Sequence, residues 1–234
     1  RRKGALATMA LTTVDRPGEF GIVGLDDDGR IFRFKEKPRT EEVFANLINA
    51  GIYVLEKRAL GDIPAGEKYD FSKQLYPKLL ERGEPLYGMP LSGLWKDIGR
   101  PRDLLDANLR MAERKGMQIS VPGAVCSGRI VASSFHALGC DIAGPAFIGE
   151  GAVIGPRARL SSCAVGDRTE VGASALIDDS FVMDGCSLGD GSVVRGSLVG
   201  RGCRIGRGVQ VISSVLGDGI VLEGEQRVEG RTIE

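Results

Sequence analysis

The sequence is short of several residue types, and each shortage argues against a class of site or partner. His136 is the one histidine among 234 residues, and no C-x-x-C pair is present. A zinc site built from histidine and cysteine is therefore not expected. Charge of neither sign is in excess, since 31 basic residues balance 31 acidic residues. A protein that binds nucleic acid needs a basic excess to neutralise phosphates, so the composition argues against that partner.

Long apolar runs are also missing. No stretch approaches the roughly 20 apolar residues that a membrane-spanning helix needs, so no membrane partner is expected. The cysteines number five, which is odd, and we expect them to be reduced, half-buried thiols of a cytoplasmic protein. They are Cys126, Cys140, Cys163, Cys186 and Cys203.

Glycine, in contrast, is abundant, and much of it belongs to a repeat in the second half of the chain. The 34 glycines are about double the usual share. From residue 148 onward, apolar residues recur at intervals of six, six and five, which gives a period of 17 residues. These positions are Ile148, Ile154, Leu160, Val165, Val171, Ile177, Val182, Leu188, Val194, Val199, Ile205, Val211, Leu216 and Leu222. A fixed period indicates stacked coils, here a three-sided prism of short parallel strands.

Two columns of small residues accompany the apolar positions. The first contains Gly155, Gly172, Gly189 and Gly206. We expect these glycines to allow corner conformations that other residues resist. The second contains Cys163, Ser180, Ser197 and Ser214 and is expected to face outward. Such a face would let two prisms pack as a symmetric dimer, so a homo-oligomer is expected. The alternative is that this face packs against the chain's own first half.

The first half of the chain alternates predicted strands and helices, which favours an α/β sheet. Strands are expected over residues 6–14 and 47–55. Two β-rich runs, over residues 21–26 and 30–35, flank Asp28-Gly29, which is a strong hairpin signal. The glycine inside residues 47–55 indicates a bulge, or a close approach of the backbone to a ligand.

A helix over residues 71–82 is predicted next, with Asp70 as its N-cap and a kink or break at Pro77. Further elements are expected at residues 86–89 and 94–96, as short strands, and at residues 101–115, as a helix. Asp97 follows the second of these strands. An aspartate at a strand end points into a cleft, where a hard cation could use its oxygens.

Four motifs in this half identify a family by resemblance. They are Phe20-Gly21-Ile22-Val23, Phe34-Lys35-Glu36-Lys37-Pro38, Asn49-Ala50-Gly51-Ile52-Tyr53 and Trp95-Lys96-Asp97-Ile98-Gly99. Their order and spacing over residues 5–115 resemble the sugar-1-phosphate nucleotidyltransferases, or nucleotide-sugar pyrophosphorylases, and most of all the mannose-1-phosphate guanylyltransferases. The repeat behind them resembles the left-handed β-helix of hexapeptide-repeat proteins.

The resemblance implies a fold and a reaction. Residues 1–116 would be the C-terminal, sugar-phosphate side of a Rossmann-like nucleotidyltransferase domain, and residues 117–234 a left-handed parallel β-helix. The enzymes of this family transfer a nucleotidyl group from an NTP to a hexose 1-phosphate and release pyrophosphate. GDP-mannose is the expected product, with UDP-glucose or dTDP-glucose as alternatives. The family's Gly-rich phosphate loop would lie upstream of Arg1, so the 234-residue chain by itself is expected to be inactive.

The resemblance also assigns roles to single residues. Lys37 would hold the sugar phosphate as a point charge, and Glu36 and Asn49 would bind the sugar. Gly21 and Gly51 would let the backbone approach the substrate. Because phosphoryl transfer depends mainly on positioning and charge neutralisation, Lys37 counts as catalytic.

Asp97 would also be catalytic, as one carboxylate ligand of a Mg²⁺ ion that bridges phosphates.

Two other classes of function stay open. A hexapeptide-repeat acyltransferase needs a histidine base, and His136 is the only candidate. A non-catalytic scaffold or regulatory subunit would keep the fold without the reaction.

Overall fold

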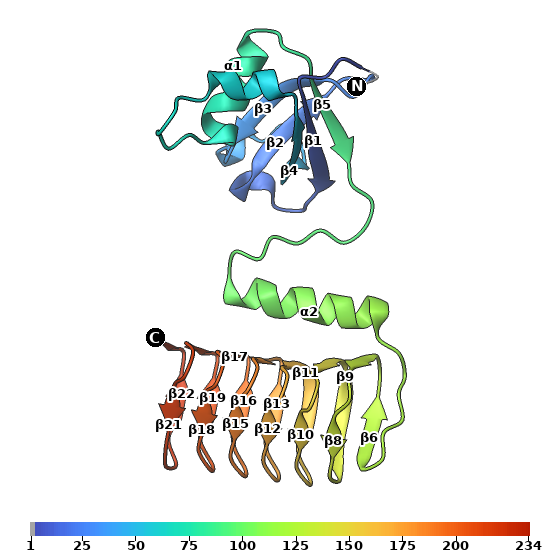
Figure 1. Ribbon diagram of the computed structural model, residues 1–234, viewed down its shortest axis with the longest axis vertical. Helices are drawn as coiled ribbons and strands as arrows, with labels where there is room; N and C mark the ends of the chain where they lie inside the picture. The colour runs from blue at the N-terminus through green and yellow to red at the C-terminus, as the bar shows by residue number, and fades with distance from the viewer. Residues whose placement is uncertain (1–2) are drawn as a thin grey trace. The chain divides into compact units, whose positions relative to one another are not determined.

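The computed structural model describes residues 3–234, and the chain divides into two compact units, Arg1–Trp95 and Lys96–Glu234. Figure 1 shows the order of the elements along the chain. Among residues 3–234, no helix is both long and apolar enough to cross a membrane. Each unit is described by itself below.

The first unit is built on a five-stranded sheet with the strand order β3-β2-β4-β1-β5. Its strands are β1 (Ala7–Thr13), β2 (Gly21–Leu25), β3 (Ile31–Glu36), β4 (Leu47–Leu55) and β5 (Leu86–Pro90). β1 pairs parallel to β5 and antiparallel to β4, and β2 and β3 form the predicted hairpin. The core of this unit includes Met9 and Leu11 of β1 together with Leu75, Tyr76 and Leu79 of the helical segment.

The helical elements of this unit are short. They are the 3-10 turns η1 (Pro17–Glu19), η2 (Thr40–Glu42) and η3 (Lys57–Asp62), the π-helical turn η4 (Phe71–Leu75) and α1 (Tyr76–Glu81). The predicted cap is confirmed, because the Asp70 carboxylate accepts hydrogen bonds from the backbone N–H groups of Ser72 and Lys73 at 2.8 and 3.0 Å. The predicted break near Pro77 is also confirmed, since η4 gives way to α1 one residue before it. Proline has no N–H to continue the hydrogen-bonding pattern.

The predicted strand over residues 94–96 is wrong, because this stretch has no regular secondary structure. Trp95 is fixed by its side chain instead. Its Nε1 donates to the carbonyl oxygen of Ala50 at 3.0 Å, and its ring meets the ring of Phe20 edge-on at 5.7 Å between centroids. A large ring with one N–H donor can anchor a loop without any strand pairing.

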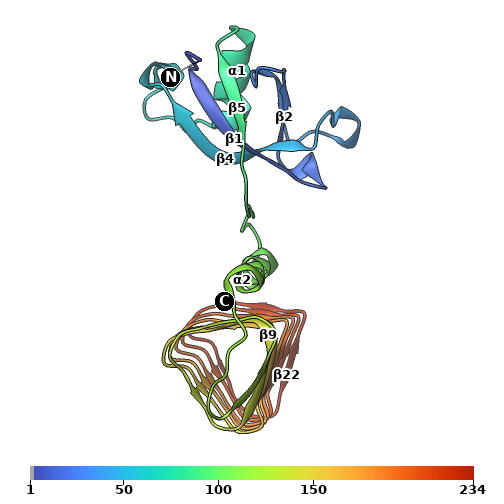
Figure 2. The same cartoon turned by 90° about the vertical axis from the view of Figure 1, so that its right-hand side faces the viewer.

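The second unit begins with α2 (Pro101–Lys115), predicted with the same bounds, and continues as a parallel β-helix. Figure 2 shows the three sides of the prism around its axis. Its strands are β6 (Ala124–Ser127), β7 (Ile130–Ala132), β8 (His136–Ala137), β9 (Cys140–Ile148), β10 (Val153–Ile154), β11 (Arg159–Val165), β12 (Glu170–Val171), β13 (Leu176–Asp178), β14 (Phe181–Val182), β15 (Ser187–Leu188), β16 (Val193–Arg195), β17 (Leu198–Val199), β18 (Arg204–Ile205), β19 (Gln210–Ile212), β20 (Val215–Leu216), β21 (Val221–Leu222), β22 (Arg227–Glu229) and β23 (Thr232–Ile233).

The pairing confirms the 17-residue period, and the stacked coils form the left-handed β-helix that the family resemblance implies. Ile154 pairs with Val171, Val171 with Leu188, and Leu188 with Ile205, always in parallel. Every apolar position of the predicted repeat is buried, with at most 8% of its surface exposed. These apolar residues therefore form the core of the prism, together with small buried residues such as Ala158 and Cys186. The predicted domain boundary at residues 116 and 117 stays a prediction. In the structure, α2 belongs to the second unit and packs against strands β9 and β11 of the β-helix.

The glycine column is present, but its physical cause differs from the expected one. None of its four glycines has a positive φ. Instead, a Cβ added to Gly172 would lie 2.6 Å from the backbone nitrogen of Asp190 and 2.7 Å from the carbonyl carbon of Gly189. These glycines are needed because the next coil lies too close for any side chain. Left-handed corner conformations occur elsewhere, and residues such as Arg157 and Asp179 adopt them as well as glycine.

Replacing Gly172 with alanine is therefore expected to lower the free energy of unfolding of the β-helix by about 1–3 kcal/mol, a typical cost of overpacking. Chemical denaturation measures the change. Gly61→Ala, in η3 of the first unit, is the control for a methyl group added in open space, because Gly61 also has an ordinary φ and nothing lies within 4 Å of its added Cβ. Equal effects of the two substitutions would contradict the steric explanation.

The second small-residue column does not face outward, so that expectation is wrong. Cys163, Ser180, Ser197 and Ser214 are at most 4% exposed. The serines form a ladder between coils: the backbone N–H of Ser197 donates to Ser180 Oγ at 3.1 Å, and that of Ser214 donates to Ser197 Oγ at 3.0 Å. The cysteines are free thiols, and four of the five are buried rather than half-buried. Small polar residues occur in these columns because they satisfy buried backbone groups.

Candidate functional site

The first part of the candidate site lies where β2 begins and β3 ends. Gly21 pairs with Glu36 across the hairpin. A Cβ added to Gly21 would lie 2.6 Å from Glu36 Oε2 and 2.8 Å from Cζ of Phe34. The absence of a side chain at Gly21 therefore lets the Glu36 carboxylate fold over the backbone of β2.

Lys37 follows β3 and turns the chain sharply. Its φ is +44°, in the left-handed region, and its backbone N–H donates to the carbonyl oxygen of Phe20 at 3.0 Å. Its side chain is exposed and makes no hydrogen bond or ion pair with the residues that the structure describes. The turn thus leaves an ammonium group beside the Glu36 carboxylate without a fixed partner.

Other charged groups lie near Glu36. Burial raises the pKa of Glu36, and the negative charge of Asp70 raises it further, while Lys37 and Lys73 oppose the shift. Asp70 and Lys73 are brought there by the start of η4, which Asp70 caps. The sequence predicted Asp70 only as the N-cap of a helix. The capping pattern itself cannot show which strand the helix start faces, so these two neighbours of Glu36 were missed.

Asn49 in β4 is held by three hydrogen bonds. Its Nδ2 donates to the Tyr53 hydroxyl at 2.7 Å and to Ser72 Oγ at 3.3 Å, and its Oδ1 accepts from the backbone N–H of Gly51 at 2.9 Å. Both N–H donors of the amide are used, so Asn49 can offer a ligand only the remaining acceptor position on Oδ1. The hydroxyl protons of Tyr53 and Ser72 remain able to donate to a ligand.

Gly51 supplies the bulge that the sequence predicted. The register of β1 against β4 shifts between Met9 and Leu11, opposite this part of β4, and Gly51 has a φ of +76°.

Tyr53 and Ser72 were missed as site residues, although Tyr53 belongs to the Asn49-to-Tyr53 motif. The structure places Asn49 close to Gly21 and Glu36, because Ile22 of β2 pairs with Ile48 of β4.

Replacing Glu36 with glutamine is expected to raise the melting temperature at neutral pH. A carboxyl group whose pKa is raised by folding binds its proton more tightly in the folded state, so stability falls as the pH rises through that pKa. Glutamine removes this penalty, and its advantage disappears in acid, where Glu36 is protonated in both states. Thermal unfolding at neutral and acid pH tests this, with the exposed Glu67→Gln as control. A lower melting temperature at neutral pH would contradict it.

Asp97 belongs to the second unit and is considered separately. It is exposed, and within residues 3–234 its carboxylate has no hydrogen bond or ion pair. A Cβ added to Gly99 would lie 3.3 Å from Asp97 Oδ2, so the carboxylate folds back over Gly99. The expected strand end is absent, and the exposed turn of residues 97–99 presents this side chain instead.

The residues present fit a magnesium ion in part. Among residues 3–234, no three His, Cys, Asp or Glu side chains cluster closely enough to hold a metal. Mg²⁺ is commonly held by only one or two carboxylates together with substrate phosphates. An exposed carboxylate such as Asp97, which has no partner among the described residues, suits that role, and Mg²⁺ bound there would neutralise phosphate charge.

His136 and one cavity are the features of the β-helix that bear on a second site. His136 in β8 is exposed, and its ring makes no hydrogen bond or ion pair with the described residues.

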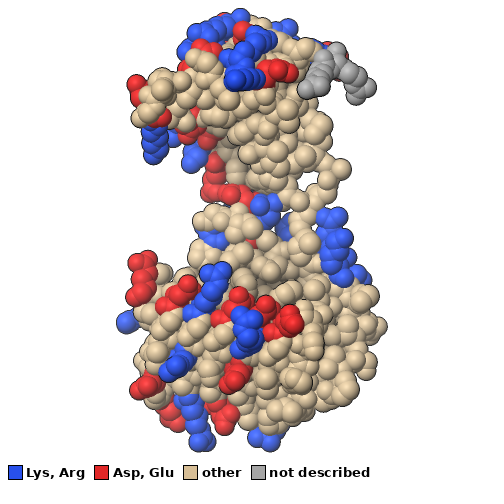
Figure 3. Space-filling view, viewed as in Figure 1, with Lys and Arg blue, Asp and Glu red and all other residues tan. Residues whose placement is uncertain are grey.

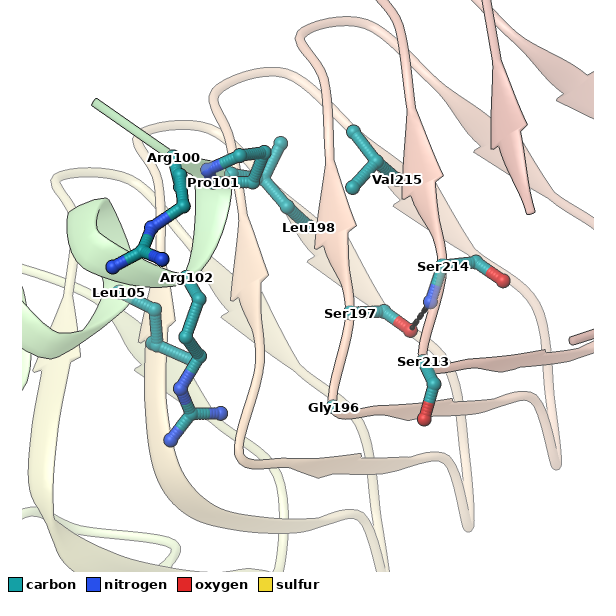
Figure 4. A pocket seen from close by; sticks show the side chains of 10 residues that line it. All are labelled: Arg100, Pro101, Arg102, Leu105, Gly196, Ser197, Leu198, Ser213, Ser214 and Val215. Carbon is teal, nitrogen blue, oxygen red and sulfur yellow. Dashed lines mark hydrogen bonds between the residues drawn. The ribbon is translucent and has the colours of Figure 1, made fainter. Parts of the chain in front are cut away.

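A cavity of about 240 Å³ lies beneath the first turn of α2 and is lined by Leu105, Leu198 and Val215 among others (Figure 4). On the face that Figure 3 shows, basic and acidic side chains lie near one another, and broad areas carry neither.

Comparisons with known proteins match both units. Residues 1–114 match the family model described as nucleotidyl transferase, and residues 141–234 match the one described as the GMPPB C-terminal domain. The chain is 35% identical over 179 residues to a UTP–glucose-1-phosphate uridylyltransferase of Synechocystis, covering 70% of this chain and 46% of the relative.

Two guanylyltransferases are similarly related. A mannose-1-phosphate guanylyltransferase of Mycobacterium tuberculosis is 30% identical over 178 residues, covering 71% of this chain and 46% of the relative. A mannose-1-phosphate guanylyltransferase catalytic subunit beta of Drosophila pseudoobscura is 40% identical over 105 residues, covering 45% of this chain and 27% of the relative. The chain therefore spans about half the length, or less, of these curated relatives.

Proposed function

Because residues 1–114 belong to the nucleotidyl transferase family and residues 141–234 to the GMPPB C-terminal domain family, we propose that the protein transfers a nucleotidyl group from an NTP to a sugar 1-phosphate. A phosphate oxygen of the sugar 1-phosphate attacks the α-phosphorus of the NTP, and the bond to the leaving pyrophosphate breaks. The products are an NDP-sugar and pyrophosphate.

The observation that carries this proposal is the group of polar side chains on adjacent strands of the first unit. Lys37 provides for the sugar phosphate an ammonium that forms no ion pair with the described residues, and Glu36 and Asn49 provide acceptors for sugar hydroxyls. Gly51 leaves the space beside its backbone open to the substrate, and the missing side chain at Gly21 makes room for the Glu36 carboxylate. Asp97 would hold Mg²⁺ on the phosphates, where the ion neutralises charge in the transition state.

Mannose 1-phosphate and GTP are the proposed substrates, since several relatives carry the name mannose-1-phosphate guanylyltransferase. The test measures pyrophosphate release by the full-length protein from GTP with mannose 1-phosphate, and from UTP or dTTP with glucose 1-phosphate. Faster release from the first pair is expected. Faster release from UTP and glucose 1-phosphate would reassign the substrate, and no release from any pair would refute the reaction.

We further propose a cytoplasmic homo-oligomer that assembles through the β-helix. Exposed apolar side chains lie on its first coil, at Val125 and Leu138, and just before that coil, at Met117, and a partner subunit would cover them. Light scattering tests this proposal: a monomeric mass at micromolar concentration would contradict it.

A further inference from the structure

Asp97 is connected to the β-helix through a second aspartate, Asp103. Asp103 lies in the first turn of α2, where its side chain is only 8% exposed. Its Oδ1 accepts from Lys96 Nζ at 2.7 Å, and its Oδ2 accepts from Arg100 Nε at 3.0 Å. Both oxygens of one nearly buried carboxylate are thus occupied by two different cations.

The two cations flank Asp97. Lys96 precedes it directly and Arg100 follows Gly99, so the turn of residues 97–99 is closed at both ends by one carboxylate. The turn has no regular secondary structure, and its three residues are exposed. Asp97 itself has no partner within residues 3–234, so its position depends on the backbone that carries it. Charge-assisted hydrogen bonds at both ends restrict that backbone.

Asp103 is in turn fixed to the β-helix through α2. Leu105 and Ala112 of α2 are buried, and the helix packs against β9 and β11. Arg102 pairs with Asp106 within the helix and with Asp179 at a corner of the β-helix. The pKa of Asp103 is lowered by its bonds to Lys96 and Arg100, so the carboxylate remains charged at neutral pH.

We propose that Asp103 is a positioning residue for Asp97, and that the β-helix thereby holds the metal-binding turn in place through α2. This inference rests on the proposed role of Asp97 in the nucleotidyl transfer. It gives the β-helix a part in catalysis that requires no catalytic group of its own. The packing of α2 on the β-helix thus fixes Asp103, and Asp103 in turn fixes the backbone on both sides of Asp97.

The main test uses Asp103→Asn in the full-length protein. Turnover is expected to fall, and the dissociation constant of Mn²⁺, measured from the EPR signal of the free ion, to rise, each by about 10- to 100-fold, as found when outer partners of metal ligands are removed. Glu113→Gln on the same helix removes one exposed carboxylate that has no partner in residues 3–234, and it is expected to change neither quantity. Unchanged Mn²⁺ affinity in Asp103→Asn would overturn the proposal.

A double-mutant cycle separates positioning from general stabilisation. If Asp103 acts through Asp97, adding Asp103→Asn to Asp97→Asn lowers turnover no further, whereas an additive loss would overturn the inference. If Asp97→Asn alone leaves turnover unchanged, the proposed role of Asp97 fails instead. Should Asp103→Asn not fold, Lys96→Gln removes one arm of the clamp and is expected to weaken Mn²⁺ binding in the same direction. Unchanged binding in that variant would equally overturn the inference.

Discussion

Asp97→Asn in the full-length protein is expected to lower turnover by about 10²- to 10³-fold, the usual loss when one preorganised electrostatic group is removed from an active site. The amide keeps the size of the side chain but loses the charge that would bind a cation. Asp97 is exposed and has no partner among residues 3–234, so the substitution removes no stabilising contact there. The melting temperature is therefore expected to stay unchanged.

Steady-state rates at saturating Mg²⁺, together with thermal unfolding, test this expectation. Asp27→Asn is the matched control, since Asp27 is another exposed aspartate without a hydrogen bond or ion pair to the described residues. If Asp97→Asn turns over as fast as the control, Asp97 is not a metal ligand. A large fall in melting temperature would show instead that Asp97 supports the structure.

Lys37→Ala is expected to weaken the use of sugar 1-phosphate far more than the use of NTP. Removing a charge-assisted contact costs about 1.5–3 kcal/mol, which corresponds to roughly a 10- to 150-fold rise in KM for the sugar substrate. The ammonium makes no ion pair with the described residues and stands next to Glu36, so it is available for a phosphate. The left-handed backbone conformation of Lys37 is held by the hydrogen bond from its N–H to the carbonyl oxygen of Phe20. Since the side chain takes no part in that bond, the alanine variant is expected to keep this conformation.

Two further variants make this prediction specific. Lys35→Ala removes a nearby ammonium on β3, one that already pairs with Glu42, and is expected to leave both KM values unchanged. Lys37→Arg keeps the charge and is expected to retain part of the affinity. An equal rise in KM for both substrates in Lys37→Ala would show that Lys37 does not bind the sugar phosphate specifically.

The β-helix shows how far periodicity alone determines a fold. Ile154, Val171, Leu188 and Ile205 stack in parallel register because each coil must bury one apolar residue on each side. That requirement recurs every 17 residues, so it is visible without any contact being known. Local signals were similarly sufficient for the cap at Asp70 and for the bulge at Gly51, because each depends on neighbours within a few residues.

Contacts between distant residues were decided only by the tertiary structure. Asn49 is held by Ser72, 23 residues away, and nothing in either local pattern predicts that pairing. The column of Ser180, Ser197 and Ser214 has the composition of a close-packing surface, yet it is buried as a ladder between coils. Composition gives the size of a side chain but not the direction in which the backbone presents it.

The turn around Asp97 shows the same division. The motif from Trp95 to Gly99 identified Asp97 as a candidate, and this much the sequence determined. It predicted a strand there, because Leu94 and Trp95 suit one, but Trp95 is instead anchored by its indole N–H on Ala50. The clamp of Lys96 and Arg100 on Asp103 requires the loop to fold back onto α2. Ion pairs of this kind depend on where the backbone brings charges together, and that position is a property of the folded chain.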